Sequence, residues 1–400
     1  MKILYLAESL PYYPCKDGFR ILAYNTLKYL SRNNQIHLVA FSNPEITKKY
    51  VHTIEKFCAT IETVQYHKPD NFYKWIRQLL SLCTFNKSIY DKIIHLINKH
   101  QIELIYAEGA NIGQYVYKIK NIPKIIAPHD SSSLRAHQLF KHSRNPINKL
   151  WFFMKWIKKI MYEKEIYNKF DHCIVVGPKD KEVINQNLPN LKVSVLSNGV
   201  DGEYYKFKPL GTTIKNNIIF TGDMSFYPNE DAVLYFCKEI LPLIHEDIKG
   251  LKFYIVGANP SKNISALAEY DFIFVTGTVE DIRKYVNQCS VYICPMRLGT
   301  GIKNKILEAM AMGIPIVSSK LGAEGINVTD GQNILIADKP VDFKNKVVEL
   351  LNSNEKRLGL SLNARNLIDN QYRWEAKGEM LEQIIKNVMQ EGNYKNGKNK

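Results

Sequence analysis

The sequence lacks a long hydrophobic run. No window approaches the roughly eighteen uninterrupted apolar residues that a membrane-spanning helix needs. The first apolar run, Met1–Ala7, soon reaches Glu8 and is too short for the hydrophobic region of a signal peptide. We therefore expect a cytoplasmic protein that is either soluble or peripheral on the inner face of the cell membrane.

Paired cysteines are missing as well. The seven cysteines are odd in number and include no CxxC pair, which argues against a disulfide framework and against a zinc site. We expect reduced thiols in a cytosolic protein, with no metal site and no cofactor.

Acidic residues are scarce relative to basic ones. The 54 Lys and Arg residues exceed the 39 Asp and Glu residues, which gives a formal net charge of +15. Such a charge indicates an anionic partner, and nucleic acid, nucleotide phosphates and an acidic membrane surface all qualify. The basic residues are spread through the chain without an aromatic RNA-binding motif, so we predict no specific nucleic-acid partner.

Short apolar runs alternate with helical patterns in both halves of the chain. The runs predicted to be strands are Ile3–Ala7, Ile36–Phe41, Leu104–Ala107, Lys124–Ala127, His172–Val176, Asn217–Thr221, Lys252–Val256, Phe272–Thr276, Val291–Pro295 and Pro315–Ser318. Strands separated by helices form parallel sheets. Two such sets predict an α/β protein with two Rossmann-like domains.

Turn signals near Asn198-Gly199 and Pro209-Leu210-Gly211 suggest the boundary between these domains. We place the N-terminal domain at residues 1–205 and the C-terminal domain at residues 206–373. Helical spacing continues through residues 374–390, and the basic, polar tail 391–400 is expected to be disordered.

The most informative stretch runs from Arg297 to Val317. It contains a glycine turn, several cations and then Glu308, in a predicted helix that ends at Gly313 before a short apolar strand. Backbone N–H groups at a helix start, with cations beside them, suit a diphosphate. A carboxylate about one turn inside can accept hydrogen bonds from sugar hydroxyls.

This stretch, through Glu308, Gly313 and Pro315, resembles the C-terminal signature of the retaining glycosyltransferases of family 4. The resemblance covers nearly the whole chain and implies the GT-B fold, with two Rossmann-like domains facing a cleft and a final helix that returns to the N-terminal domain. It implies a metal-independent, hexosyltransferase-like enzyme. The donor would be a nucleoside-diphosphate sugar, and the acceptor a glycan or lipid-linked molecule in cell-surface polysaccharide synthesis.

The resemblance also implies site roles in the C-terminal half. Glu308 would bind the donor ribose, and Thr278 and Val279 would lie in the loop that contacts the nucleotide base. The residues expected around the donor diphosphate are Gly18, Gly222, Arg297, Thr300, Gly301, Ile302, Lys303 and Lys305. Lys303 is also expected to stabilise the charge that grows on the leaving group.

Two loops of the first half complete the expected site. His129 follows a predicted strand and could hydrogen-bond a sugar hydroxyl or carry a proton. Asp130 is expected to orient His129, so both are counted as catalytic. Glu108 follows another strand and is expected to face the acceptor.

The chain departs from the family pattern in two places. Of the two Glu residues that the pattern separates by seven others, the second matches Glu308 and the first is replaced by Thr300. An Arg and a Lys that many members carry near Asp223 and Asn229 are absent. These departures keep a non-catalytic sugar- or nucleic-acid-binding protein open as the alternative. A sugar epimerase or a phosphorylase of the same fold is a further rival.

Residues 148–164 combine aromatic residues with lysines. At helical spacing Phe153, Trp156, Ile157 and Ile160 share one face, and the lysines lie on the other side with Trp151. The helix either buries its apolar face in the domain or lies on anionic lipid.

Overall fold

The computed structural model describes residues 1–14, 18–65, 86–143, 145–208, 216–299 and 301–397. Thr300, an expected diphosphate ligand, lies outside this described part. The chain divides into unit 1, Met1–Ser197 with Lys377–Lys400, and unit 2, Asn198–Ala376. The division precedes the expected position at residue 205, because Val200 pairs with Arg373 and Asn198 donates to Asn304, both in unit 2.

Unit 1 is built on a parallel sheet. Its strands, among the described residues, lie in the order β3-β2-β1-β4-β5-β6-β7. Their bounds are β1 Lys2–Ala7, β2 Gln35–Phe41, β3 Thr60–Val64, β4 Leu104–Glu108, β5 Lys124–His129, β6 His172–Val175 and β7 Val193–Val195. The central strands β1, β4 and β5 are almost wholly buried, which is why they read as continuous apolar runs.

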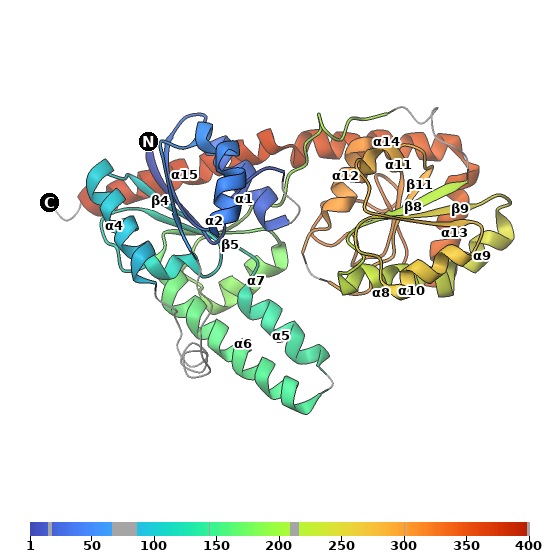
Figure 1. The fold of residues 1–400 in the computed structure, drawn as a ribbon, viewed down its shortest axis with the longest axis horizontal. Helices are drawn as coiled ribbons and strands as arrows, with labels where there is room; N and C mark the ends of the chain where they lie inside the picture. The colour runs from blue at the N-terminus through green and yellow to red at the C-terminus, as the bar shows by residue number, and fades with distance from the viewer. Residues whose placement is uncertain (15–17, 66–85, 144, 209–215, 300, 398–400) are drawn as a thin grey trace. The chain divides into compact units, whose positions relative to one another are not determined.

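Helices lie beside this sheet, and α5 and α6 extend away from it (Figure 1). Their bounds are α1 Gly18–Leu30, α2 Pro44–Tyr50, α4 Lys87–His100, α5 Ser132–His142, α6 Pro146–Ile166, α7 Pro178–Asn187 and α15 Trp374–Gly397. Several begin at Asn or Ser side chains that accept from backbone N–H groups, as Asn145 does from Ile147 at 2.9 Å at the start of α6.

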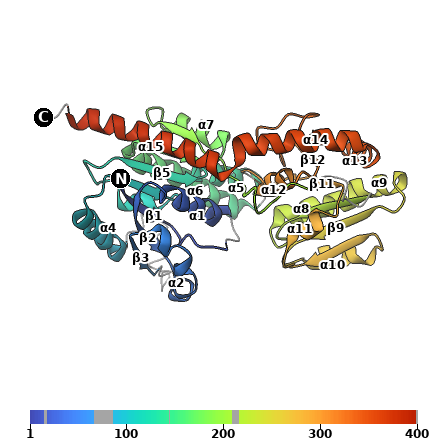
Figure 2. The ribbon, with the colours of Figure 1, turned by 90° about the horizontal axis from the view of Figure 1, so that it is seen from above.

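The long helix α15 (red in Figure 2) brings the end of the chain back into unit 1. Leu381, Ile385 and Val388 are buried in the same cluster as β1 and β4 residues. Gly378 allows close approach, since a Cβ there would lie 2.0 Å from ring atoms of Tyr29. The helix ends at Gly397, so the backbone beyond Gln390 is helical where the sequence suggested a disordered tail.

Unit 2 repeats the architecture with a second parallel sheet. Among the described residues its strand order is β10-β9-β8-β11-β12-β13. The strands are β8 Asn217–Thr221, β9 Lys252–Val256, β10 Ile273–Gly277, β11 Val291–Cys294, β12 Ile316–Ser318 and β13 Leu335–Ile336. The helices are α8 Tyr227–Tyr235, α9 Leu241–Asp247, α10 Lys262–Ala266, α11 Ile282–Val286, α12 Asn304–Met312, α13 Pro340–Asn352 and α14 Asn354–Leu367.

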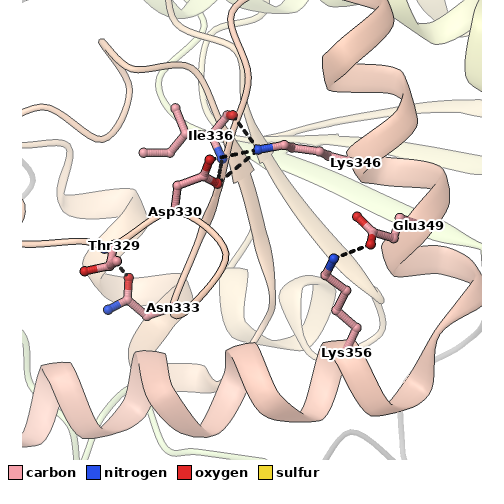
Figure 3. A network of polar contacts seen from close by, with 7 residues as sticks. All are labelled: Thr329, Asp330, Asn333, Ile336, Lys346, Glu349 and Lys356. Carbon is pink, nitrogen blue, oxygen red and sulfur yellow. Dashed lines mark hydrogen bonds and ion pairs between the residues drawn. The ribbon is translucent and has the colours of Figure 1, made fainter.

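The edge strand β13 is held by polar contacts as well as by its ladder (Figure 3). Asp330 accepts from the backbone N–H of Ile336 at 2.8 Å and from Lys346 Nζ of α13 at 3.0 Å. Lys346 also donates to the Ile336 carbonyl at 2.7 Å. A strand of two residues without a hydrophobic period gives no sequence signal of its own, so β13 was not predicted.

Gly257 offers a test of this packing. A Cβ at Gly257, whose φ is 149°, would lie 1.8 Å from the carbonyl oxygen of Gly222. We expect Gly257→Ala to lower the free energy of unfolding by about 3 kcal/mol, since backbone must move. Gly359→Ala is the matched control: a Cβ on this α14 glycine meets nothing within 4 Å, so about 0.5–1 kcal/mol of stabilisation is expected. Equal unfolding midpoints in urea would contradict the prediction.

Candidate functional sites

The candidate site of unit 2 lies at the start of α12, next to β8 and β11. The strand order changes direction between these two strands, and ligands of open α/β sheets bind at such a point. Gly299 and Gly301 have φ values of 103° and 74°, which only glycine adopts readily. Lys303 occupies the N-cap position, and its side chain makes no hydrogen bond to the first backbone N–H groups of α12.

Lys305 is the innermost cation of this site. Its Nζ donates to Asn229 Oδ1 at 2.7 Å and lies 4.0 Å from the centre of the Phe220 ring. Asn229 is held in turn, because its Nδ2 donates to the Asp223 carbonyl at 2.9 Å. Burial lowers the pKa of Lys305 to about 8. Asn229, noted in the sequence only for replacing a cation, is therefore the residue that positions one.

Two neighbouring residues complete the cationic group. Gly222 leaves room for Lys305, since a Cβ there would lie 2.9 Å from Nζ. Lys303 Nζ donates to the Gly301 carbonyl at 2.6 Å, and its charge contributes to the lowered pKa of Lys305. Two cations held together at a helix start repel each other, so a bound anion would relieve the repulsion.

Glu308 lies further along α12. Burial raises its pKa, while a hydrogen bond with Tyr205 and the charge of Lys305 lower it. Burial and the nearby Glu308 also raise the pKa of the Tyr205 hydroxyl. The sequence gave no reason to single out Tyr205. Ile302, another expected diphosphate ligand, packs beside Gly325: a Cβ added at Gly325 would lie 2.9 Å from Cγ1 of Ile302.

The loop expected to contact the nucleotide base follows β10. Thr278 is exposed, and Val279 is half-buried against the core of unit 2. Asp281, beyond it, caps α11 by accepting from the Arg283 N–H at 3.0 Å. An exposed Thr beside an anchored helix start leaves this loop free to meet a ligand.

Arg297 does not join Lys303 and Lys305 in the structure. Its guanidinium donates to Asp231 at 3.1 and 2.6 Å and lies 4.2 Å from the Tyr235 ring centre. Residues 229 and 231 of α8 are separated by about 200° around the helix axis. The ion pair therefore holds Arg297 at Asp231 in this structure, and its place among the phosphate-binding cations stays a prediction.

The candidate site of unit 1 is centred on His129, at the end of β5. His129 adopts a φ of 70° and is 8% exposed. Its Nε2 contacts Glu108 Oε1, and the Tyr5 hydroxyl donates to Glu108 Oε2 at 2.9 Å. Tyr106 also hydrogen-bonds this carboxyl. The Glu108 carboxyl thus lies between two tyrosine hydroxyls and one imidazole.

These contacts correct two expectations. Glu108 is fully buried, so it contacts His129 instead of facing an acceptor. Asp130 does not orient His129; its nearest charged partner is Arg135, with a nitrogen–oxygen distance of 4.0 Å, and both side chains are well exposed. Glu108 holds the imidazole in place of Asp130.

Gly18 begins α1 close to this imidazole. The next residue, Phe19, stacks on the His129 ring with centroids 4.4 Å apart. Phe19, Tyr5 and Tyr106 were not predicted as site residues, because aromatic residues in strands and at a helix start are usually read as core.

The described residues contain no group of three or more His, Cys, Asp or Glu side chains placed to hold a metal ion. None of their helices combines the length and hydrophobicity needed to cross a bilayer.

Comparisons with known proteins agree with this architecture. The model described as Glycosyltransferase Family 4 matches residues 17–204, and the model described as Glycosyl transferases group 1 matches residues 215–353. An uncharacterized 44.6 kDa protein in the cps region of Klebsiella pneumoniae is 21% identical over 390 residues, covering 93% of this chain and 96% of that protein.

Two further similar proteins have names that state an activity or a bound ligand. The lipopolysaccharide 1,2-N-acetylglucosaminetransferase of Salmonella typhimurium is 22% identical over 299 residues, which are 68% of this chain and 77% of that protein. The structure of HepE from Anabaena in complex with UDP and glucose matches with a TM-score of 0.66 at 15% identity, covering 97% of this chain and all (100%) of that one.

Proposed function

Because the chain belongs to the glycosyltransferases of family 4 and group 1, which have the GT-B fold, we propose that it transfers a hexosyl group from a nucleoside-diphosphate sugar to a glycan or lipid-linked acceptor. The observation that carries this proposal is the Lys303–Lys305 pair at the start of α12. The Salmonella relative, named as an N-acetylglucosaminetransferase of lipopolysaccharide, and the Klebsiella relative in the cps region support a role in cell-surface polysaccharide synthesis.

The site of unit 2 would act on the leaving group. Lys303, Lys305 and the amides near Gly301 would bind the diphosphate and stabilise the negative charge that grows on it as the glycosidic bond breaks. Glu308 would accept hydrogen bonds from ribose hydroxyls. No metal is required in this scheme, because side-chain and backbone donors supply the positive potential.

The site of unit 1 would act on sugar hydroxyls. A His129 whose Nε2 proton is donated to Glu108 presents Nδ1 as an acceptor. We propose retention of the anomeric configuration through attack on the same face as the leaving group, since no pair of carboxylates in the sequence identifies a covalent nucleophile. A lipid-linked acceptor would place the protein on the inner face of the cell membrane.

The direct test incubates the purified protein with UDP-, GDP- and ADP-hexoses and a mixture of saccharide acceptors. Release of one nucleoside diphosphate with formation of an elongated saccharide is expected, in the presence of EDTA. Binding of a nucleoside diphosphate without transfer to any acceptor would favour the non-catalytic alternative. A free epimerised sugar nucleotide would favour the epimerase rival.

The lowered pKa of Lys305 predicts how binding depends on pH. Below pH 8 the ammonium is charged and attracts the diphosphate; as pH rises through the pKa of about 8 the charge is lost. The Kd of the cognate nucleoside diphosphate should therefore rise with pH, by up to about tenfold per unit. Titration calorimetry from pH 7 to 9.5 measures this. Lys305→Met should bind weakly with a Kd independent of pH, and a wild-type Kd that stays constant would contradict the assignment.

A further inference from the structure

Helix α6 has two apolar faces, and only one of them is packed. On the packed face Trp156 stacks on His137 of α5, with ring centroids 4.3 Å apart, and Phe153 lies 5.6 Å from Phe140. Phe153 and Ile157, which the sequence placed on the packed face, are each 40% exposed. Part of the apolar surface of α6 is therefore left in contact with water.

The second face forms an exposed apolar stripe, which we call the α6 stripe, and Lys158 lies within it by the same helical spacing. Its members recur at intervals of three and four residues, so they lie on one side of the helix. They are Ile147 (77% exposed), Leu150 (61%), Trp151 (36%), Met154 (52%), Ile157 (40%) and Met161 (52%). Large exposed apolar patches of this kind mark interaction surfaces. Figure 1 shows α5 and α6 side by side, projecting from the sheet of unit 1.

The positive charge around the α6 stripe indicates which kind of partner binds it. The sequence from Ser131 to Met161 contains no Asp or Glu. Its cations are Arg135, Lys141, Arg144, Lys149, Lys155, Lys158 and Lys159. Lys155 Nζ lies 4.9 Å from the ring centre of Trp151, so cation and aromatic sit together beside the stripe. A second copy of this chain would bring two cationic hairpins together, and that repulsion disfavours a dimer through this face.

We propose that the α5–α6 hairpin docks on an anionic lipid bilayer, with the α6 stripe at the boundary between headgroups and acyl chains. Trp151 suits that boundary because its ring is apolar and its N–H polar. Lys141, Lys149, Lys155 and Lys158 would contact lipid phosphates, each adding electrostatic attraction. Lys159 is not counted among them, because its Nζ donates to Asn111 at 3.0 Å. This identifies the docking element and the lipid chemistry for the proposed peripheral location; the binding itself does not require sugar transfer.

The test is cosedimentation of the full chain with vesicles, without nucleotide sugar. Vesicles of phosphatidylcholine alone are compared with vesicles containing 30% phosphatidylglycerol, at two salt concentrations. Wild-type protein is expected to bind the anionic vesicles at least about tenfold more tightly than the neutral ones, and less at high salt. Equal binding to both vesicle types, or no binding to either, would overturn the proposal.

Variants locate the surface. Leu150→Ser with Met154→Ser, both exposed, should weaken binding to anionic vesicles by about tenfold or more without changing the unfolding midpoint. The matched control is Val341→Ser with Leu358→Ser, since these unit 2 side chains are 59% and 47% exposed; it should bind as the wild type does. Stripe variants that bind normally would overturn the assignment. Transfer to a water-soluble acceptor should be unchanged in all variants. Absence of transfer by the wild type would be a failure of the proposed function and not of the docking surface.

Discussion

Lys305→Met is expected to lower kcat/KM by about 10²- to 10³-fold, the usual effect of removing one donor aimed at charge that develops in the transition state. Methionine keeps the length and apolar stem of lysine and removes the charge. The hydrogen bond to Asn229 Oδ1 is lost, but Asn229 keeps its bond to the Asp223 carbonyl. Steady-state kinetics with the cognate donor measures the effect.

Stability separates this loss of activity from unfolding. The lowered pKa of Lys305 means that its charged form is destabilised by burial. The folded pKa lies below that of the unfolded chain, so the unfolded state binds more protons between about pH 8 and the usual lysine pKa of 10.5. Wild-type stability should therefore rise with pH across this window, and Lys305→Met should abolish that rise without lowering the unfolding midpoint at pH 7.

Three other variants test the phosphate assignment. Lys284→Met removes an exposed lysine of α11 and controls for net charge; it should leave kcat/KM unchanged. Lys303→Ala should lose far more turnover than Asp281→Ala, because Asp281 only caps α11 and pairs with Arg283. Comparable losses in the last two variants would contradict a phosphate-binding role for Lys303.

The central strands of both sheets could be predicted because they are buried on both faces. The strand from Asn217 to Thr221 and that from Lys252 to Val256 match the structure at both ends. The edge strands Thr60–Val64 and Val193–Val195 escaped prediction, because the first has neither an apolar run nor a regular alternation and the second has three residues. Their position in the sheet, and not their sequence period, makes them strands.

The candidate sites also combine features that the sequence pattern reveals with features that only the fold determines. Loop position after a strand is readable, so His129 could be nominated from it, whereas Gly301 and Glu308 were nominated from the signature between Arg297 and Val317. Pairing between loops distant in the chain is not readable: Glu108 and His129 are 21 residues apart, and Asn229 and Lys305 are 76 apart. Asp130 was assigned to His129 because the two are adjacent in the sequence, and the fold places Asp130 beside Arg135.

Glu108→Gln is the second variant with a large expected effect, a fall in kcat of about 10- to 100-fold, typical of losing a group that orients a catalytic histidine. A carboxylate only accepts hydrogen bonds, so the His129 proton in the wild type lies on Nε2. In the variant the amide oxygen can still accept from Tyr5, which turns the amide NH₂ toward His129; alternatively, the Tyr5 hydroxyl donates to the Ala23 carbonyl at 3.1 Å and accepts from the amide. In the first arrangement His129 accepts at Nε2 and carries its proton on Nδ1, so the variant should gain the Nδ1–H tautomer.

Nitrogen-15 NMR of the imidazole reads this exchange directly, independently of any effect on folding. The wild type should show the Nε2–H tautomer of His129 and Glu108→Gln the Nδ1–H tautomer, with unchanged shifts for His245 of unit 2. Asp130→Asn is the matched control: its carboxyl is exposed and close to Arg135, so tautomer and kcat should stay those of the wild type. If Asp130→Asn lowered kcat as much as Glu108→Gln, Glu108 would not be the residue that positions His129. A changed tautomer with full activity would show that the proton acceptor at Nδ1 is not needed for transfer. Because Glu108 is fully buried and cannot reach a substrate, its whole contribution to turnover must pass through the imidazole that it holds.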